Sequence, residues 1–410
     1  MTRSALRRKH LPLAALALLL CSAPGLAQRL QLLPGTDVQL GTPLAITASE
    51  LPPGTELLLR SERRLRGWDG QPVLYRAEAR FQADAAGRLD LAQARPLPGG
   101  SYTEPDVQGL FWSARPQPGP VPEDLPPGQV RLTLQAADRA PVALTLTLRD
   151  GDPALSSTPV PGFPGALLVR PPAADAATAR PAVITLGGSE GGGQTAAMFA
   201  RRLASQGFVA MSLPYHSPMR FGPQGPMAPE LPELPQAFAD IPLERLQAAR
   251  DWLAAQPGVD PARIGVYGAS KGAEYGLLAA VRMPWIRALV AAVPSDVSWE
   301  GWGPGTTEGQ SPSFSWQGRP VPFVPYRGMA AEMQGFATGS AVRFRRVHDG
   351  GRADHPERAA AARIPVEDFA GALLVIGGGD DQVWDSGGMA QAIVERRRAA
   401  GRPTEAVIEP

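Results

Sequence analysis

Residues 263–281 read as a strand, a tight turn and a helix, and the turn has glycine at its two ends and serine at its centre. The pattern G-x-S-x-G is formed there by Gly268, Ser270 and Gly272. Such a turn exposes a serine hydroxyl at the edge of a mostly parallel sheet, and it needs glycines because side chains would collide with the strand and helix. The pattern therefore predicts an α/β fold and makes Ser270 a candidate nucleophile.

Apolar strands alternate with helical stretches from about residue 160 to residue 410. The predicted elements are 182–186, 196–205, 208–213, 243–255, 264–267, 273–282, 288–293, 373–376 and 389–400. This alternation implies right-handed crossovers and a mostly parallel sheet with flanking helices. Segments 214–240 and 299–329 are rich in proline and glycine, and we expect them to form long loops at the carboxyl edge of the sheet, where substrates are selected.

Residues 28–150 have a different pattern, in which apolar residues recur at every second position. The clearest examples are 44–48, 130–134 and 142–148, and turn signals rich in proline and glycine separate the runs. This period of two is typical of antiparallel strands with one buried face. We therefore predict an immunoglobulin-like β-sandwich domain before the α/β domain.

Residues 1–27 are predicted to be a signal peptide. Four cations precede the apolar run Leu11–Leu20, and Gly25–Ala27 resembles a small-x-small cleavage site. The run is too short to span a bilayer, so no integral membrane segment is expected after cleavage. We expect an exported protein, periplasmic or secreted. Lipid attachment at Cys21 is the less favoured alternative, since Leu20 is bulky for the position before a lipidated cysteine.

Composition excludes several classes of function. The formal net charge is +1, and removing the leader's cations leaves a slightly acidic chain without the basic footprint of a nucleic-acid-binding protein. Cys21 is the only cysteine, so the exported form is expected to lack disulfides, thiol catalysis and cysteine-ligated metals. We predict no metal and no organic cofactor. Lys271, next to Ser270, is the only lysine besides Lys9.

The G-x-S-x-G pattern occurs a second time, at Gly187–Gly191. Position distinguishes the two copies, because an early glycine loop donates backbone N–H groups to an oxyanion and the nucleophile turn follows two strands later. We assign the first copy, with Gly188 and Ser189, to the oxyanion loop. The second donor is then the backbone N–H of Lys271, the residue after Ser270.

A catalytic acid is expected in a loop after a later strand, where it orients a histidine. The predicted strand 373–376 runs into Gly377–Trp384, which contains two adjacent aspartates. We favour Asp381 as the acid, with Asp380 as the alternative. Both carboxylates also fit the simpler role of capping a turn.

A base and a substrate pocket are harder to assign. His216 follows the strand 208–213 and is expected to line the pocket rather than to act as base. His348 and His355 lie in an arginine-rich segment, where we expect surface or loop-structural roles. Trp299, with Trp302 and Trp316, is a candidate for an apolar acyl pocket, although tryptophans in long loops also serve to pack those loops.

Taken together, these residues resemble the acyl-CoA thioester hydrolase and bile acid-CoA:amino acid N-acyltransferase family over about residues 40–410. The resemblance rests on the Gly268–Gly272 turn and on six further motifs, which are Leu51–Gly54, Gly109–Ser113, Ile241–Glu244, Asp251–Leu253, Ile364–Glu367 and Gly379–Gln382 with Trp384. It implies a β-sandwich joined to an α/β-hydrolase domain. It also implies a small-molecule acyl thioester or ester as substrate, cleaved through a Ser270–Asp381–histidine triad.

Serine is the nucleophile of the family's thioesterases and cysteine that of its acyltransferases, so Ser270 implies hydrolysis rather than transfer to an amine. The family's histidine follows the last strand, which is 405–408 here, and we expect it just beyond Pro410 in a sequence that is truncated or frameshifted. Two alternatives stay open. One is an exported carboxylesterase or amidase on the same scaffold, and the other is an inactive ligand-binding protein that lacks the base.

Overall fold

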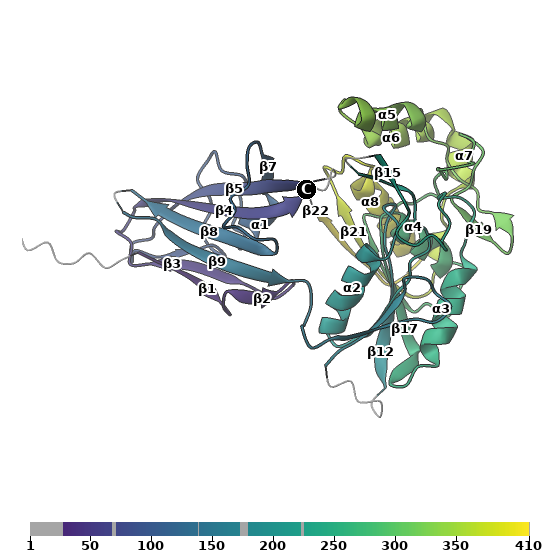
Figure 1. The fold of residues 1–410 in the computed structure, drawn as a ribbon, viewed down its shortest axis with the longest axis horizontal. Coiled ribbons are helices and arrows are strands. Elements are labelled where there is room, and N and C mark those ends of the chain that lie inside the picture. Colours follow the sequence, from purple (N-terminus) through teal and green to yellow (C-terminus); the bar gives the residue numbers. More distant parts are fainter. Residues whose placement is uncertain (1–27, 68–70, 138, 173–178, 223–224, 410) are drawn as a thin grey trace, which may run out of the picture. The chain divides into compact units, whose positions relative to one another are not determined.

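A computed structural model describes residues 28–67, 71–137, 139–172, 179–222 and 225–409 (Figure 1). The predicted signal peptide and Cys21 therefore lie outside the described residues. The chain divides into two compact units, one made of residues up to 146 without 37–42 and 66–72, and the other made of the remainder. In the part of the chain that is described, no helix has the length and apolar character needed to cross a membrane.

Residues 29–149 are rich in β-strands, as the period of two predicts. One sheet has the order β1 (Arg29–Leu33), β3 (Ala45–Ser49) and β6 (Leu89–Asp90). The other has the order β2 (Asp37–Gln39), β9 (Val142–Arg149), β8 (Gln129–Ala136), β4 (Glu56–Arg66), β5 (Pro72–Gln82) and β7 (Arg115–Gln117), and a short helix, α1 (Gly109–Trp112), precedes β7. Along β3 and β8 every second residue is buried, so each sheet hides one face, as in a β-sandwich.

The second unit is built on an eight-stranded sheet. Its order is β10 (Ser156–Pro159), β11 (Leu167–Arg170), β13 (Val209–Ser212), β12 (Arg180–Leu186), β17 (Val259–Ala269), β18 (Ala288–Ala292), β21 (Ala372–Gly378) and β22 (Thr404–Glu409). The six strands from β13 to β22 are parallel, and the two at the β10 edge are antiparallel. The predicted α/β-hydrolase domain is confirmed, and the parallel strands all end at one edge.

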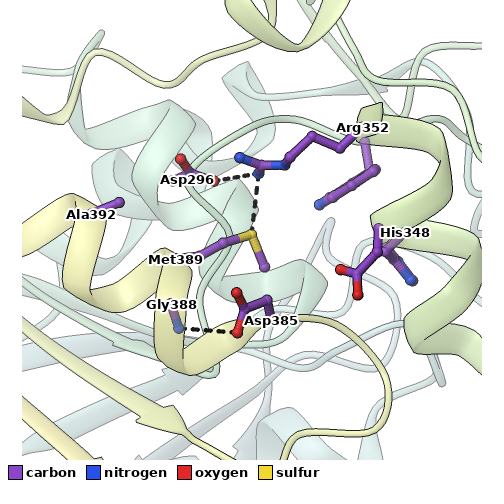
Figure 2. A pocket seen from close by; sticks show the side chains of 9 residues that line it. Asp296, His348, Arg352, Asp385, Gly388, Met389 and Ala392 are labelled. Atoms are coloured by element: carbon purple, nitrogen blue, oxygen red, sulfur yellow. Dashed lines mark hydrogen bonds and ion pairs between the residues drawn. The ribbon is translucent and has the colours of Figure 1, made fainter. Parts of the chain in front are cut away.

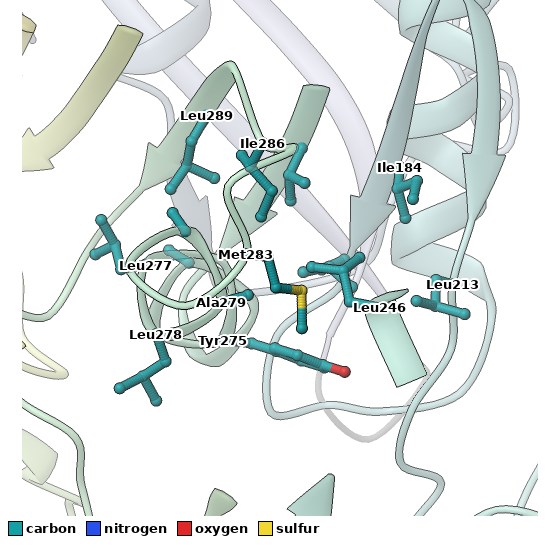
Figure 3. Packing of buried hydrophobic residues seen from close by; sticks show 14 of the residues in the cluster. Ile184, Leu213, Leu246, Tyr275, Leu277, Leu278, Ala279, Met283, Ile286 and Leu289 are labelled. Atoms are coloured by element: carbon teal, nitrogen blue, oxygen red, sulfur yellow. The ribbon is translucent and has the colours of Figure 1, made fainter. Parts of the chain in front are cut away.

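Four helices pack on this sheet: α2 (Gln194–Ser205), α3 (Glu244–Ala254), α4 (Lys271–Ala280) and α8 (Ser386–Ala399). Helix α3 buries Leu246, Ala249 and Leu253 at the spacing seen in the sequence. Helix α4 is buried on every side, which explains its apolar composition. Figure 3 shows Leu246 and Met283 lying beside Tyr275 of α4 in the core. The turn that carries Ser270 is therefore followed by a helix that is buried in the core of the unit.

The segments that we predicted to be long loops contain short regular elements. Segment 214–240 includes the hairpin β14 (Arg220–Gly222) and β15 (Gly225–Met227), and β19 (Phe314–Trp316) pairs with β16 (Ile241–Pro242) and β20 (Arg319–Pro320). Beyond them lie α5 (Met329–Thr338), α6 (Phe344–Asp354), α7 (Pro356–Ala361) and the 3₁₀ turn η1 (Val366–Asp368). The sequence analysis missed these helices because glycine and arginine dilute their apolar pattern.

Arg397 of α8 fixes the last strand to the rest of the unit. Its side chain is fully buried, and its guanidinium donates to the carbonyl oxygens of Val366, Phe369, Gly371 and Pro403 at 2.7–2.9 Å. A guanidinium has five N–H donors in a fixed plane, so one arginine side chain can bond several carbonyl oxygens at once.

Replacing Arg397 with methionine is expected to lower the free energy of unfolding by about 3–5 kcal/mol, because it leaves several buried carbonyl groups without donors. Chemical denaturation measures this change. The matched control is Arg398→Met, an exposed neighbour on the same helix, which should shift stability by no more than about 0.5 kcal/mol. Equal stability of the two variants would contradict the assigned role.

Candidate active site

Ser270 occupies the sharp turn between β17 and α4 that the sequence predicted. Its backbone has φ +55° and ψ −123°, a region that non-glycine residues rarely adopt. The turn is held on both sides, because the Ser270 N–H donates to Ala292 O at 2.9 Å and its carbonyl accepts from the N–H groups of Ala273 and Glu274. Strain of this kind persists only where the surroundings enforce it, and it is concentrated at functional sites.

The two glycines of the turn are required by close backbone approaches. A Cβ added at Gly268 would lie 2.1 Å from the carbonyl oxygen of Gly272, and one added at Gly272 would lie 2.3 Å from Gly187 O. Neither neighbour is a side-chain tip that could rotate away. The G-x-S-x-G pattern therefore reflects packing between β17, α4 and the end of β12.

The first G-x-S-x-G copy lies beside Ser270, as the assignment to an oxyanion loop requires. A Cβ added at Gly188 would come within 3.2 Å of the Ser270 Cβ atom. The loop is held by Tyr215, whose hydroxyl donates to Gly187 O at 2.7 Å, and by the Gly192 N–H, which donates to His216 O at 2.8 Å. The loop after β12 and the turn after β17 therefore lie side by side at Ser270.

The backbone N–H groups proposed as oxyanion donors differ in their hydrogen-bond partners. The Gly188 N–H donates to the carboxylate of Glu190 at 2.9 Å, so it is already occupied in the free protein. Ser189 is exposed. The Lys271 N–H opens helix α4, where backbone N–H groups have no partner within the helix. The N–H groups of Lys271 and Ser189 remain candidate donors, whereas that of Gly188 is bonded to Glu190.

Asp381 lies in the loop after β21, at the same sheet edge as Ser270. One carboxylate oxygen accepts from the Val383 and Trp384 N–H groups at 2.8 and 3.3 Å, and the other accepts from the Ser386 hydroxyl at 2.5 Å. Asp381 is half-buried, whereas Asp380 is exposed. These contacts and the partial burial favour Asp381 over Asp380 as the acid. The Asp381 carboxylate also caps its own turn, as the simpler interpretation predicted.

His216 lies against the glycine loop. Its side chain is 1% exposed, and its ring contacts those of Phe238 and Trp302 edge-on. Neither ring nitrogen makes a hydrogen bond of normal geometry among the described residues. Burial lowers the pKa of His216 to about 4, and the Gln236 backbone only partly opposes this shift. The ring is thus neutral and packed beside the loop, with its Nδ1 atom 2.9 Å from the position of a Cβ on Gly191.

The expectation of a surface or loop-structural role for His348 is wrong, because the residue is buried in a helix. It is 5% exposed and belongs to α6, with the rings of Trp299, Tyr326 and Trp384 around it at 4.8–5.5 Å. Its Nδ1 atom contacts Phe344 O at 2.9 Å. The pattern Phe344–Val347–His348–Gly351 has helical spacing and could have revealed the burial. His355 is exposed.

Stability is expected to fall as the pH drops from about 6.5 to about 4. Burial lowers the pKa of His216 and of His348 to about 4, whereas an unfolded histidine titrates near 6.5. Between these values the unfolded chain binds more protons than the folded one, so the free energy of unfolding rises with pH. Each ring contributes up to about 3 kcal/mol to this dependence.

Thermal unfolding at several pH values between 4.5 and 7 tests this expectation. His348→Phe keeps the edge-on ring contacts and should make the dependence of Tm on pH shallower. The control His355→Gln changes an exposed ring and should leave the slope unchanged. Identical slopes for His348→Phe and the unmodified protein would contradict the prediction.

A cavity of about 180 Å³ lies between α6, the start of α8 and the segment after β18 (Figure 2). Its lining includes Trp299, His348 and Arg352, and the Arg352 guanidinium pairs with the Asp296 carboxylate at 2.5 Å. Trp299 lines this cavity but Ser270 does not, so the role of Trp299 in an acyl pocket stays a prediction. Across the described residues, no group of three histidine, cysteine or acidic side chains could hold a metal ion.

Comparisons with known proteins follow the same division of the chain. A model of the acyl-CoA thioester hydrolase/BAAT N-terminal region matches residues 41–159, and one of the BAAT/acyl-CoA thioester hydrolase C-terminal region matches residues 241–409. Together they match more than half of the chain.

Curated relatives include a mitochondrial acyl-coenzyme A thioesterase 2 from Rattus norvegicus, 30% identical over 64% of this chain and 55% of the relative. Acyl-coenzyme A thioesterase 1 from Mus musculus is 27% identical over 89% of this chain and 80% of the relative. An acyl-coenzyme A amino acid N-acyltransferase 2 from Rattus norvegicus is 26% identical over 88% and 80%. A solved esterase from Thermogutta terrifontis has 15% sequence identity and a TM-score of 0.37, over 64% of this chain and 84% of the esterase.

Proposed function

Because this chain belongs to the acyl-CoA thioester hydrolase and bile acid-CoA:amino acid N-acyltransferase family, we propose that it is a serine hydrolase that cleaves small-molecule acyl thioesters. The observation that carries the proposal is the strained backbone of Ser270 at the start of α4. The neighbouring oxyanion loop supports it, since Gly188 approaches the Ser270 side chain directly. No metal or organic cofactor is required for this chemistry.

In the proposed reaction the Ser270 hydroxyl oxygen attacks the acyl carbonyl carbon while a base takes the hydroxyl proton. The carbonyl oxygen becomes an oxyanion that accepts from the N–H groups of Lys271 and Ser189. The intermediate then collapses, the bond to sulfur breaks, and the thiol leaves with a proton. Water hydrolyses the resulting acyl-serine ester by the same steps and restores Ser270.

The base of the proposed triad is a histidine oriented by Asp381. Among the described residues, no hydrogen bond joins a histidine to Ser270 or to Asp381. The family resemblance assigns the base to a position after the last strand. Glu409 at the end of β22 lies opposite Gly378 of the parallel strand β21, and the loop after β21 carries Asp381.

Export, predicted from residues 1–27, favours a second candidate function. An exported enzyme works away from cytoplasmic acyl-CoA, and the same serine and oxyanion donors would also cleave oxygen esters or amides. The substrate class is therefore the point that most needs an experiment.

The experiment compares acyl thioesters with matched oxygen esters and amides of the same acyl chain on one preparation of the protein. We expect the highest kcat/KM for the thioester. A clear preference for the oxygen ester or amide would replace the thioesterase proposal by the carboxylesterase or amidase alternative. Inactivity on all of them, together with no reaction of Ser270 with a fluorophosphonate, would leave the ligand-binding interpretation.

A further inference from the structure

A buried ion pair lies directly behind the candidate nucleophile. The ammonium of Lys271 and the carboxylate of Glu274, on the first turn of α4, are 2.6 Å apart, and their side chains are 3% and 0% exposed. Burial lowers the pKa of Lys271 and raises that of Glu274, and each charge opposes the shift of the other. Removing two charges from water is costly, so such a pair is weak evidence for a role in stability alone.

The ammonium of Lys271 also holds a segment that is distant in the sequence. It donates to the Ser313 hydroxyl at 3.0 Å, and that hydroxyl in turn donates to Glu300 O at 2.8 Å. The rings of Phe238, Trp302 and Phe314 lie 5.1–5.8 Å from the ammonium, within the range of attraction between a cation and an aromatic face. Lys271 thus bonds to one end of the segment 298–316.

Glu274 bonds to the other end of this segment. Its second carboxylate oxygen accepts from the Ser298 hydroxyl at 2.9 Å and from the Trp299 N–H at 3.0 Å. One oxygen of the Glu274 carboxylate therefore accepts from Lys271, and the other accepts from the chain segment that follows β18. Because all these groups are buried, the contacts are stronger than the same contacts in water.

We propose that Lys271 and Glu274 are positioning residues, whose side chains lock the segment 298–316 onto the first turn of α4 and so hold the Lys271 backbone N–H at the oxyanion position. This inference rests on the proposed function. The strained Ser270 backbone makes such a lock useful, because a turn that is not enforced would relax and move the donor. Displacements of about 1 Å at a reacting centre can cost on the order of 10²-fold in rate.

Three variants test the proposal: Lys271→Met, Glu274→Gln and the double variant Lys271→Met/Glu274→Gln. Each leaves the backbone N–H of residue 271 in place, and glutamine at 274 keeps an oxygen for Ser298 and Trp299. Each single variant leaves one buried group without its partner, so Tm should fall. The double variant removes both charges, and its Tm should recover most of the loss.

The decisive comparison is between Tm and kcat. We expect kcat for an acyl thioester to fall on the order of 10²-fold in all three variants, with KM changed by less than about threefold, and to stay low in the double variant although Tm recovers. Recovery of kcat together with Tm would overturn the proposal, since the pair would then only fill a buried space. The control Arg397→Met should lower Tm and leave kcat unchanged at temperatures where it is folded.

Hydrogen exchange of the backbone amides gives a readout that does not depend on activity. We expect faster exchange in peptides that cover 269–275 and 298–316 in the double variant, and not in Arg397→Met. If the unmodified protein neither hydrolyses esters nor reacts with a fluorophosphonate, the proposed function fails, and faster exchange in both segments still supports the lock. Unchanged exchange in both segments would overturn the lock whatever the activity. Variants that do not fold are excluded by their circular dichroism, and the double variant then carries the test.

Discussion

Replacing Ser270 with alanine is expected to abolish reaction with a fluorophosphonate and to lower kcat/KM for an acyl thioester on the order of 10⁴-fold or more. The variant keeps the backbone N–H groups around the oxyanion, so any residual rate reports their contribution. Alanine is smaller than serine and faces the same positive φ, so Tm should stay within a few degrees. Covalent labelling followed by intact mass, together with steady-state kinetics, measures the effect.

Ser189→Ala is the matched comparison, because Ser189 belongs to the other G-x-S-x-G copy and its side chain is exposed. The substitution keeps the backbone N–H, so the Ser189→Ala protein should still react with the fluorophosphonate. The opposite pattern, with labelling lost in Ser189→Ala and kept in Ser270→Ala, would exchange the roles of the two loops.

Gly272→Ala is expected to lower the free energy of unfolding by more than about 3 kcal/mol and to abolish labelling of Ser270. The added Cβ would lie 2.3 Å from Gly187 O and 2.8 Å from Leu186 O. Both oxygens belong to the backbone at the end of β12, so relief requires α4 to move away from the oxyanion loop. Insertion of atoms into a packed core commonly costs about 1–3 kcal/mol when side chains can adjust, and this site has no such freedom.

Gly276→Ala on the same helix is the control. Its Cβ would meet the tip of the Leu289 side chain at 2.9 Å, which can rotate, and alanine favours the helix over glycine by about 1 kcal/mol. Chemical denaturation should therefore place Gly276→Ala near the unmodified protein and Gly272→Ala far below it. Normal stability and normal labelling of Gly272→Ala would contradict the close packing at the turn.

The sequence was sufficient to predict the sheet and the sharp turn at Ser270 because both depend on local patterns. The glycines around Ser270 follow from steric limits on a few neighbouring residues, and the strands that flank it have uninterrupted apolar runs. The same reasoning placed the glycine loop and Asp381 at the correct sheet edge, since strand ends in a parallel sheet lie together.

The remaining features depend on contacts between distant segments. The helical spacing around residue 348 indicates a buried face, but it does not specify that α6 packs this face against Trp299 and Trp384. Lys271 was conspicuous as the only lysine besides Lys9, and Glu274 follows it at helical spacing, yet their partners in 298–316 could not be deduced. The hydrogen bond from the Gly188 N–H to the Glu190 carboxylate likewise depends on a side-chain conformation, which a sequence pattern does not specify.

The central claim is that Ser270 is an activated nucleophile. Its most direct test is to treat the unmodified protein with a fluorophosphonate, digest it and locate the adduct by mass spectrometry. The account predicts one adduct, on the peptide that contains Ser270, and its loss when the protein is unfolded before treatment. No adduct, or an adduct at Ser189 or another serine of the folded protein, would contradict it.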